Sequence, residues 1–422
     1  MMPASLRVFA LSLAMMAGGA FAQVPVSSPL EQAWERFATA QQNALQIART
    51  RAAQSDDPQA LGEAYRHVMR QLVDAVRVSA QHDPLAPRFS RIVELGGESG
   101  LDNPDTEYQM ALIDGTQSYR ISGSLNSHRQ IFVQSIGGQP GIGDAGPGDI
   151  IDTLAGSANL TLGEDGSFEI TASAQQPDGT QNWLRLADHA QTILVRFTDS
   201  SWDENAPTDY LHIERLCDAC PTPPSAIDDE KAIAQLDRAS AAIEDRTRSW
   251  LGIAQRLWAN IPRNGFGPVR ETPNGLAGQF SVWGTFDLGP DEAMIITVPA
   301  SDAPYQGIQL ASRYFASLEY RARQSSLTRE QAQVDPDGMI RFVVAASDPG
   351  VWNWLDTEGR GEGLIMLRWQ GAHAQPSPGP VGKVVTLGEL ASALPHSTRR
   401  ASTDQRREQL RKRMLVVDRR LQ

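Results

Sequence analysis

Two arginines stand beside amides and hydroxyls between residues 321 and 331, where the chain could bind a small molecule. The polar side chains of this cluster are Arg321, Arg323, Gln324, Ser325, Ser326 and Gln331. A guanidinium offers a rigid fork of N–H donors, so two of them with amide and hydroxyl partners could hold a carboxylate or the hydroxyls of a sugar. The alternative is a loop whose polar side chains bond to the backbone.

A second polar set follows at Asn353, Trp354, Asp356 and Arg368. We place Asp356 and Arg368 on adjoining strands, where they could form an ion pair or an acid/base site, with the tryptophan offering a face to a sugar ring. The tripeptide Asn-Trp-Leu also occurs at residues 182–184. This recurrence favours a structural corner, in which the asparagine bonds to the backbone and the tryptophan fills the core.

Other chemistry has weaker support in the sequence. Asp102, Asp105 and Glu107 could bind calcium, but their spacing does not fit an EF-hand loop, and an Asx-type turn is the favoured interpretation. The seven histidines are scattered, with no His-Glu-x-x-His pair and no Gly-x-Ser-x-Gly elbow. The glycine-rich loop 137–148 lacks the Lys-Ser/Thr of a phosphate loop. We therefore assign no catalytic residue, no metal and no cofactor.

The first 22 residues are typical of a secretory signal peptide. Arg7 supplies the positive start, an apolar run follows, and Ala20-Phe21-Ala22 forms a cleavage site. The apolar run is shorter than the ~20 residues of a membrane span. We therefore expect a periplasmic or secreted protein with no transmembrane segment.

The two cysteines, Cys217 and Cys220, are separated by two residues. In an oxidising compartment they could form a local disulfide, and either a local disulfide or a free pair is the favoured interpretation. Redox chemistry and metal binding are the alternatives. A thioredoxin-like role would need a βαβ setting, and a zinc site would need more ligands.

The elements that would position these residues are mainly strands with added helices. Apolar spacing predicts helices over residues 30–50, 58–80 and 225–259, with core stripes that include Trp34 in the first and Leu61, Tyr65 and Val76 in the second. Strands dominate residues 92–215 and 263–387, bounded by turn signals such as Asp165-Gly166 and Asp337-Gly338.

The two strand-rich regions share an order of motifs. In each, Asp-Gly opens a strand, Asn-Trp-Leu follows at nearly the same distance, and an apolar strand containing an arginine closes the pattern. We interpret this as a diverged internal duplication of a whole domain. Residues 305–332 have no counterpart in the first copy and are expected to be an insertion.

These observations divide the 422 residues into two related jelly-roll-like β-sandwiches, each preceded by a helical segment. The expected ranges are 1–22 signal peptide, 23–90 helical segment, 91–224 first β-sandwich, 225–262 helical connector, 263–390 second β-sandwich and 391–422 basic C-terminal helix. The net charge of −12 argues against nucleic-acid binding, which needs a basic footprint. The basic helix is expected to dock on the acidic body, or alternatively to contact an anionic surface.

The second strand-rich region resembles a known family. Asp335-Pro-Asp-Gly338, Asp348-Pro-Gly-Val-Trp-Asn-Trp-Leu-Asp-Thr357 and Leu367-Arg-Trp369, with Arg323-Gln-Ser-Ser-Leu327 upstream, are similar to the domain-of-unknown-function 1214 family over residues 272–385. The resemblance implies a jelly-roll-like sandwich and transfers no catalytic residue. Some relatives carry a family 1254 domain in front, so the first half is either such a diverged domain or the duplicated copy.

The sequence does not identify a reaction. The leading hypothesis is an exported protein that binds a small polar ligand or glycan in the second sandwich, near residues 305–332. The alternatives are a periplasmic hydrolase or lyase that uses carboxylates there, and an envelope scaffold that engages a partner. A pocket with convergent polar groups would favour the first two.

Overall fold

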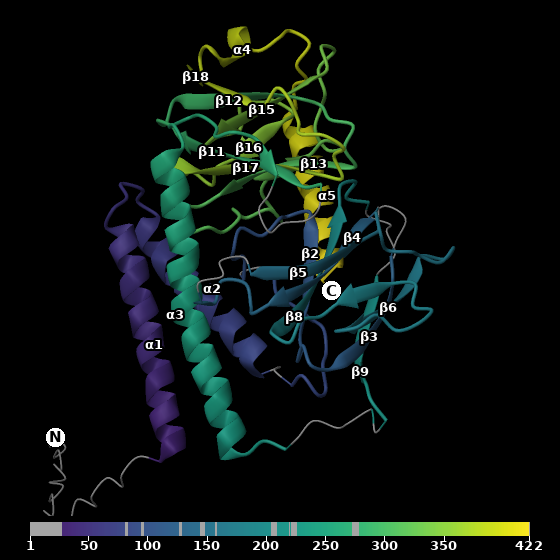
Figure 1. Ribbon diagram of the computed structural model, residues 1–422. Helices are drawn as coiled ribbons and strands as arrows, with labels where there is room; N and C mark the ends of the chain where they lie inside the picture. Colours follow the sequence, from purple (N-terminus) through teal and green to yellow (C-terminus); the bar gives the residue numbers. More distant parts are fainter. Residues whose placement is uncertain are drawn as a thin grey trace, which may run out of the picture.

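A computed structural model gives the structure of the protein and describes residues 28–421 except 81–82, 94–96, 126–128, 144–147, 157, 204–208, 219, 221–225 and 272–277. The expected signal peptide, residues 1–22, and residues 222–225 of the linker lie outside this set. The described chain forms two β-sandwiches, one above the other, with long helices along one side (Figure 1). None of the described helices has the length and hydropathy needed to cross a lipid bilayer.

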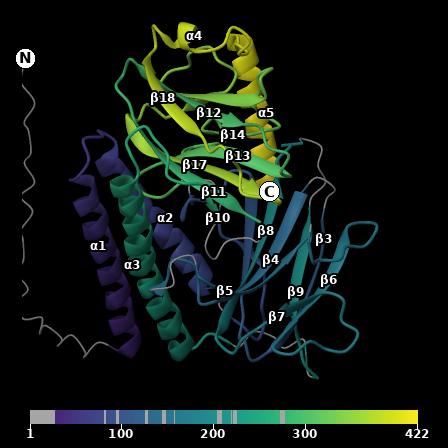
Figure 2. The same cartoon turned by 45° about the horizontal axis from the view of Figure 1, so that its top comes forward.

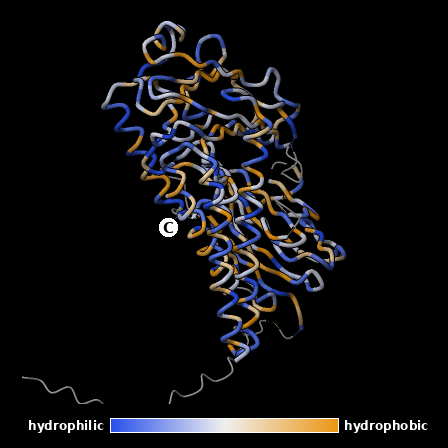
Figure 3. Tube along the Cα trace, turned by 90° about the vertical axis from the view of Figure 1, so that its left-hand side faces the viewer, coloured by the Kyte–Doolittle hydropathy of each residue, from blue (hydrophilic) through white to orange (hydrophobic). Residues whose placement is uncertain are grey.

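Three long helices form the helical layer. They are α1 (Pro29–Ala52), α2 (Ala60–Ala80) and α3 (Asp229–Asn260). Ser28 begins α1 with a capping box, because its hydroxyl accepts from the Glu31 N–H while the Glu31 carboxylate accepts from the Ser28 N–H. Buried alanines of α1, among them Ala40, Ala44 and Ala48, let it pack closely on its neighbours. Hydrophilic and hydrophobic residues are interspersed along the helices of this layer, as in amphipathic helices (Figure 3).

The orientation of α2 contradicts the prediction that its large apolar residues lie in the core. Leu61, Tyr65 and Val76 are 55%, 46% and 44% exposed. In α1, Trp34 is likewise exposed. Apolar periodicity identified the helices correctly, but it did not identify the face that packs.

The physical reason is a polar network on the inner face of α2. The buried polar residues of this face are Glu63, His67, Arg70 and Gln71. Arg70 pairs with Glu98 at 2.9 Å, and Glu63 pairs with Arg360 at 3.0 Å. Charges that are paired in this way can be buried, and small apolar residues of α2 fill the space between them.

The first β-sandwich consists of a five-stranded and a four-stranded sheet. Its strands are β1 (Ser90–Arg91), β2 (Thr106–Leu112), β3 (Ser118–Ser124), β4 (Arg129–Gly137), β5 (Asp149–Ala155), β6 (Ser167–Ser173), β7 (Trp183–Arg185), β8 (Ala190–Asp199) and β9 (Tyr210–Leu216). The sheet orders are β1-β2-β8-β4-β5 and β7-β6-β3-β9. Inward-facing residues of both sheets, such as Val195 and Ile121, form one core.

The second β-sandwich lies above the first and repeats its architecture (Figures 1 and 2). Its strands are β10 (Arg270–Glu271), β11 (Phe280–Asp287), β12 (Glu292–Pro299), β13 (Tyr305–Ala311), β14 (Ser326–Thr328), β15 (Met339–Ala345), β16 (Trp354–Asp356), β17 (Glu362–Gln370) and β18 (Val381–Thr386). The sheet orders are β10-β11-β17-β13-β14 and β16-β15-β12-β18. The short helix α4 (Leu390–Ala393) and the final helix α5 (Thr403–Leu421) follow.

The sheet orders of the two sandwiches correspond strand for strand, from β1 with β10 to β9 with β18. The pair β6–β7 is parallel, and so is its counterpart β15–β16. The prediction that residues 305–332 are an insertion is therefore wrong, because β13 and β14 occupy the sheet positions of β4 and β5. The sequence obscured this match because the loops between these strands differ.

Asn182 and Asn353 make the same contacts in the two sandwiches. The Asn182 side chain accepts from the Thr161 N–H and donates to the carbonyls of Thr161 and Glu169, at 2.8–3.0 Å. Asn353 does the same with the backbone of Gln333 and Arg341, at 2.7–3.0 Å. The Asn-Trp-Leu motif is thus a corner that ties a loop to the strand before it, as the structural interpretation expected. The expectation that the tryptophan fills the sandwich core is wrong: Leu184 and Leu355 lie in the two cores, whereas Trp183 is partly exposed and Trp354 packs in a separate cluster.

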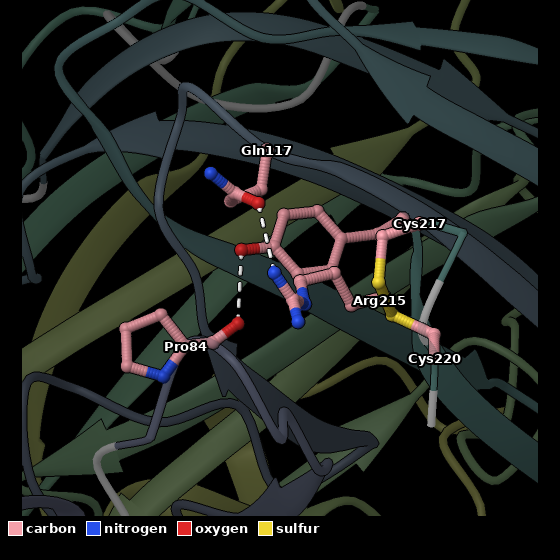
Figure 4. The surroundings of a disulfide bond; sticks show 6 residues. Pro84, Gln117, Arg215, Cys217 and Cys220 are labelled. Atoms are coloured by element: carbon pink, nitrogen blue, oxygen red, sulfur yellow. Dashed lines mark hydrogen bonds between the residues drawn. A yellow bond between two sulfur atoms is a disulfide. The ribbon is translucent and has the colours of Figure 1, made fainter. Parts of the chain in front are cut away.

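Cys217 and Cys220 form a disulfide just after β9 (Figure 4). Near it, the Arg215 guanidinium donates to the Gln117 amide oxygen at 3.1 Å, which ties β9 to the turn before β3. The Tyr119 hydroxyl donates to the Pro84 carbonyl at 3.1 Å, which ties β3 to the chain after α2. The disulfide therefore lies at an edge that is also fixed by hydrogen bonds.

The C-terminal helix α5 runs from the second sandwich down to the first (Figure 1). It docks with the buried arginines Arg406, Arg413 and Arg420, which recur every seven residues. Arg413 donates to the Tyr320 and Ser326 carbonyls at 3.1 and 2.9 Å, and Arg420 donates to the Pro104 carbonyl at 2.6 Å. Contact of α5 with an anionic surface stays a prediction.

We expect Asn182→Ala and Asn353→Ala each to lower the free energy of unfolding by about 2–4 kcal/mol, because each leaves buried backbone groups without a partner. Urea denaturation followed by tryptophan fluorescence measures the change. Asn43→Ala, which removes an exposed side chain that contacts Glu244, is the matched control and should change stability by less than about 0.5 kcal/mol. Wild-type stability in either corner variant would contradict the structural role.

Candidate functional site

The polar cluster of residues 321–331 is occupied by contacts within the protein. The Arg321 guanidinium pairs with Asp418 of α5, with Nη2 at 2.6 Å from Oδ2. Arg323 pairs with Asp356 at 2.9 Å. The Gln324 amide donates to the carbonyls of Trp352 and Trp354, at 3.1 and 2.6 Å.

The remaining members of that cluster are also bonded. The Ser325 hydroxyl donates to the Glu319 carbonyl at 2.9 Å, the Ser326 hydroxyl accepts from Arg413 at 2.8 Å, and the Gln331 amide oxygen accepts from the Thr328 N–H at 3.0 Å. These contacts fix the loop to α5 and to its own backbone. A ligand site in this cluster stays a prediction, and the contacts favour its structural alternative.

Asp356 and Arg368 do not lie on adjoining strands, because β16 and β17 belong to different sheets. Asp356 accepts from Arg323 and from the Glu358 N–H. Arg368 donates to the Gln309 amide oxygen at 2.6 Å and to the Leu101 carbonyl at 2.9 Å. The expected acid/base pair is therefore not formed. Between β16 and β17 the chain passes from one sheet to the other, which separates two residues that are close in sequence.

Two carboxylates of the candidate calcium site, Asp102 and Asp105, accept hydrogen bonds from different partners. Asp102 accepts from the backbone and the hydroxyl of Ser317, at 3.2 and 2.6 Å. Asp105 accepts from the Trp202 indole and the Tyr305 hydroxyl, both at 2.7 Å. Burial raises the pKa of Asp102 to about 6, with Glu98 adding to the shift, and burial also raises the pKa of Asp105. Their role is to join the first sandwich to the second.

We name residues 97–106 the hub segment, because it contacts all parts of the fold. Gly100 has φ +66° and lies against Trp250 of α3, so a side chain there would meet the indole at 3.1 Å. The next residue bonds to the Phe315 carbonyl through its N–H. The hub segment thus sets the relative position of the helical layer, both sandwiches and α5.

A small cavity lies where the α1–α2 connection meets the second sandwich. Its lining residues are Arg51, Ser55, Asp57, Ala60, Arg313, Tyr314, Arg360 and Glu362. The space open to the centre of a water molecule is about 10 Å³, enough for about one ordered water. Partly exposed Ser55, Arg313 and Glu362 form its rim.

Two of the three arginines around this cavity have carboxylate partners. Arg313 pairs with Glu362 at 2.6 Å. Arg360 pairs with Glu63, Glu358 and Asp57, at 3.0, 3.3 and 3.6 Å. The carboxylates at the cavity are therefore all held in ion pairs.

Arg51 differs from the other two arginines. It is only 7% exposed, and among the described residues it pairs with no carboxylate; its Nη1 donates to the Gln54 amide oxygen at 3.3 Å. Its Nη2 is buried without a hydrogen-bond partner in the described part of the chain. Burial lowers the pKa of Arg51, and the positive charge of Arg313 lowers it further, whereas Tyr314 and the Glu362 carboxylate act in the opposite direction. An anion or a water at this position would satisfy the free donor.

Behind the cavity, His67 of α2 packs on Tyr314, with ring centroids 5.8 Å apart. The Tyr314 hydroxyl donates to the Ala60 carbonyl at 2.8 Å, and burial raises its pKa to about 12. Burial lowers the pKa of His67 to about 3, and the positive charge of Arg70 acts in the same direction. The histidine is therefore neutral at pH 7.

Sequence reasoning did not identify the cavity, because its arginines come from three distant segments with no local motif. One signal was present. Arg51 follows Ala44 and Ala48 at helical spacing on the buried stripe of α1. A charged residue at such a position predicts either a buried partner or a ligand.

The comparisons with known proteins give a fold and no activity. The family described as "Protein of unknown function (DUF1214)" matches residues 149–200, which span β5 to β8 in the first sandwich. The motifs that resemble this family lie in the second sandwich, on strands that correspond to these. No curated protein matches the chain.

Two solved structures are similar to the chain. An uncharacterised protein from Burkholderia cenocepacia is 28% identical, with a TM-score of 0.77, and the match covers 86% of this chain and 98% of that one. It fits the two-domain β arrangement. The VPA0106 protein from Vibrio parahaemolyticus is 10% identical, with a TM-score of 0.45, over 76% of this chain and 98% of that one; at this score the likeness supports no conclusion.

His67 and Asp102 predict opposite pH dependences. The folded pKa of His67 lies below its unfolded value of 6.5, so the unfolded chain takes up the proton first and stability falls as the pH drops below 6.5. The folded pKa of Asp102, about 6, lies above its unfolded value of 3.8, so its contribution is greatest at low pH and is lost as the pH rises through 6.

From pH 7 to pH 5, we expect His67→Gln to gain about 2 kcal/mol of stability relative to the wild type, and Asp102→Asn to lose about 1 kcal/mol. Urea denaturation at several pH values measures both differences, and only the change with pH matters, because each substitution also has a constant effect. Parallel curves for the wild type and His67→Gln would show that His67 is not buried in its neutral form.

Proposed function

We propose that this is an exported protein that binds a small anionic ligand, such as a carboxylate, at Arg51. The observation that supports the proposal most strongly is the Arg51 guanidinium, which is buried beside a cavity, pairs with no carboxylate among the described residues and has a buried Nη2 without a partner there. A buried charge of this kind destabilises a protein unless something compensates it. A bound anion is the chemistry that compensates a guanidinium best.

The size of the cavity limits the ligand. Space for about one water suits one oxygen of a small carboxylate, with the rest of the molecule lying toward the rim. A sugar ring is too large for the enclosed part. The proposal therefore narrows the expected small polar ligand or glycan to a small anion, and moves the site from residues 321–331 to the junction between the α1–α2 connection and the second sandwich.

The hydrolase or lyase alternative has less support at this site. A general base or nucleophile must be free to accept a proton or attack. Glu362 accepts from both Arg313 and Ser55 at 2.6 Å, and Asp57 accepts from the Gln59 N–H at 2.8 Å. These carboxylates position the arginines.

Export is proposed from two features. The pattern of residues 1–22 is that of a signal peptide. The disulfide between Cys217 and Cys220 suits an oxidising compartment. Cell fractionation with N-terminal sequencing of the mature chain tests this, and we expect it to begin at Gln23.

We also propose that the two sandwiches arose by duplication of one domain related to the DUF1214 family. Their matching strand orders and the equal hydrogen bonds of Asn182 and Asn353 support this origin. Common sandwich topology alone would not require the asparagine contacts to be the same.

The ligand proposal is tested by thermal shift and calorimetry with formate, acetate, succinate and inorganic phosphate, with chloride at equal ionic strength as the reference. A ligand that binds only the folded state stabilises it by ~2.7 kcal/mol at a hundredfold excess over its Kd. Arg51→Met should weaken binding at least about tenfold, because it removes charge-assisted hydrogen bonds worth ~1.5–3 kcal/mol.

Arg49→Met, an exposed neighbour on α1, is the matched control and should bind as the wild type does. Without ligand, Arg51→Met should be at least as stable as the wild type, because an unpaired buried charge is replaced by an apolar side chain of similar length. Equal anion responses in the wild type and Arg51→Met would overturn the proposed site. A stable wild type that responds to none of the anions would do the same.

A further inference from the structure

The outer face of α2 is an apolar stripe exposed to solvent. We define the α2 stripe by five side chains that are 44–65% exposed, namely Leu61, Tyr65, Met69, Val73 and Val76. Spacings of four, four, four and three residues place them along one side of the helix. The opposite side holds the buried polar network, so rotating the helix to bury the stripe would break the ion pairs of Glu63 and Arg70.

The α2 stripe is nearly free of charge. Along α2, every residue of which the structure describes, Arg66 is the one charged side chain at an exposed position. The other exposed positions add only Gly62 and Ala80. Contiguous apolar surface of several hundred Å² is typical of an interaction site on an otherwise polar protein.

The stripe is symmetric about its centre. Tyr65 and Val73 lie four residues on either side of Met69, and Leu61 and Val76 lie eight and seven residues away. In an antiparallel pair of identical helices related by a two-fold axis, residues at equal distances on opposite sides of the axis face each other. Met69 would then face Met69, Tyr65 would face Val73, and Leu61 would face Val76.

The charges beside the α2 stripe are paired within the chain. Arg66 lies 3.8 Å from Glu63, and Asp74 accepts from Arg77 at 3.1 Å and from Arg246. A partner helix on the stripe would therefore contact mainly apolar side chains.

We propose that a second copy of this chain covers the α2 stripe and that the protein forms an antiparallel α2–α2 dimer centred on Met69. The inference is independent of the ligand proposal. The stripe and its rim in two copies give an interface near the lower end of the standard range, ~1,200 Å². A reversible dimer with a Kd in the micromolar range is expected.

The association is measured by sedimentation equilibrium of the full mature chain over a wide concentration range. Met69→Asp should weaken dimerisation at least a hundredfold, because it places two carboxylates on the two-fold axis in apolar surroundings. Ala241→Asp introduces the same charge at an exposed position of α3 and should leave the Kd unchanged. Circular dichroism and the melting temperature of each monomer verify that the variants fold.

Disulfide trapping tests the register. Met69→Cys should form a linked dimer on mild oxidation. Tyr65→Cys chains should link to Val73→Cys chains and not to themselves, because two copies of residue 65 would lie about 12 Å apart along the axis. Efficient self-linking at residue 65 would overturn the register and with it the proposed dimer.

A wild type that is monomeric at all concentrations would overturn the proposal, as would a dimer that tolerates Met69→Asp. Flotation with vesicles of phosphatidylglycerol and phosphatidylethanolamine distinguishes the competing occupant. Monomers that bind these vesicles, and lose this binding in Met69→Asp, would show that the stripe contacts lipid and not a second copy.

Discussion

The buried carboxylates of the hub segment are the constraint on which the rest of the structure depends. Asp102 is satisfied by Ser317, and Asp105 by Tyr305 and Trp202. Because a buried carboxylate without donors is costly, Asp102 and Tyr305 cannot separate from their partners without exposing charge or losing bonds. The two sandwiches therefore have one relative position, although each has its own apolar core.

The final helix completes the same constraint. Arg413 and Arg420 both lie over the Trp202 ring, each with its guanidinium carbon 4.5 Å from the ring centroid. Their charges counteract the burial that raises the pKa of Asp105. The arginines of α5 therefore fall into two groups. Arg406, Arg413 and Arg420 donate to backbone carbonyls of the two sandwiches. Exposed arginines pair within the helix, as Arg411 does with Glu408. These hydrogen bonds explain how α5, which has few apolar residues, docks against both sandwiches.

Sequence reasoning predicted the parts of the fold that local chemistry determines. The helices, the strand-rich regions and the Asn-Trp-Leu corner follow from apolar periodicity, turn residues and a side chain that can bond three backbone groups. Sequence reasoning failed where contacts between residues far apart in the sequence determine the structure. The prediction of the buried face of α2 was wrong because Glu63 and Arg70 pair with Arg360 and Glu98, which lie outside α2 in the sequence. The cavity was missed for the same reason, since Arg51, Arg313 and Arg360 meet only after three segments pack.

The two features that break the usual rules lie on the same helical layer. Arg51 is buried without a carboxylate partner among the described residues, and α2 has an exposed apolar face; each of these features lowers the stability of a monomer. Features of this kind are expected at functional sites. Arg51 lies in the last turn of α1 and Ala60 begins α2, so the cavity lies at the start of the helix whose outer face carries the stripe.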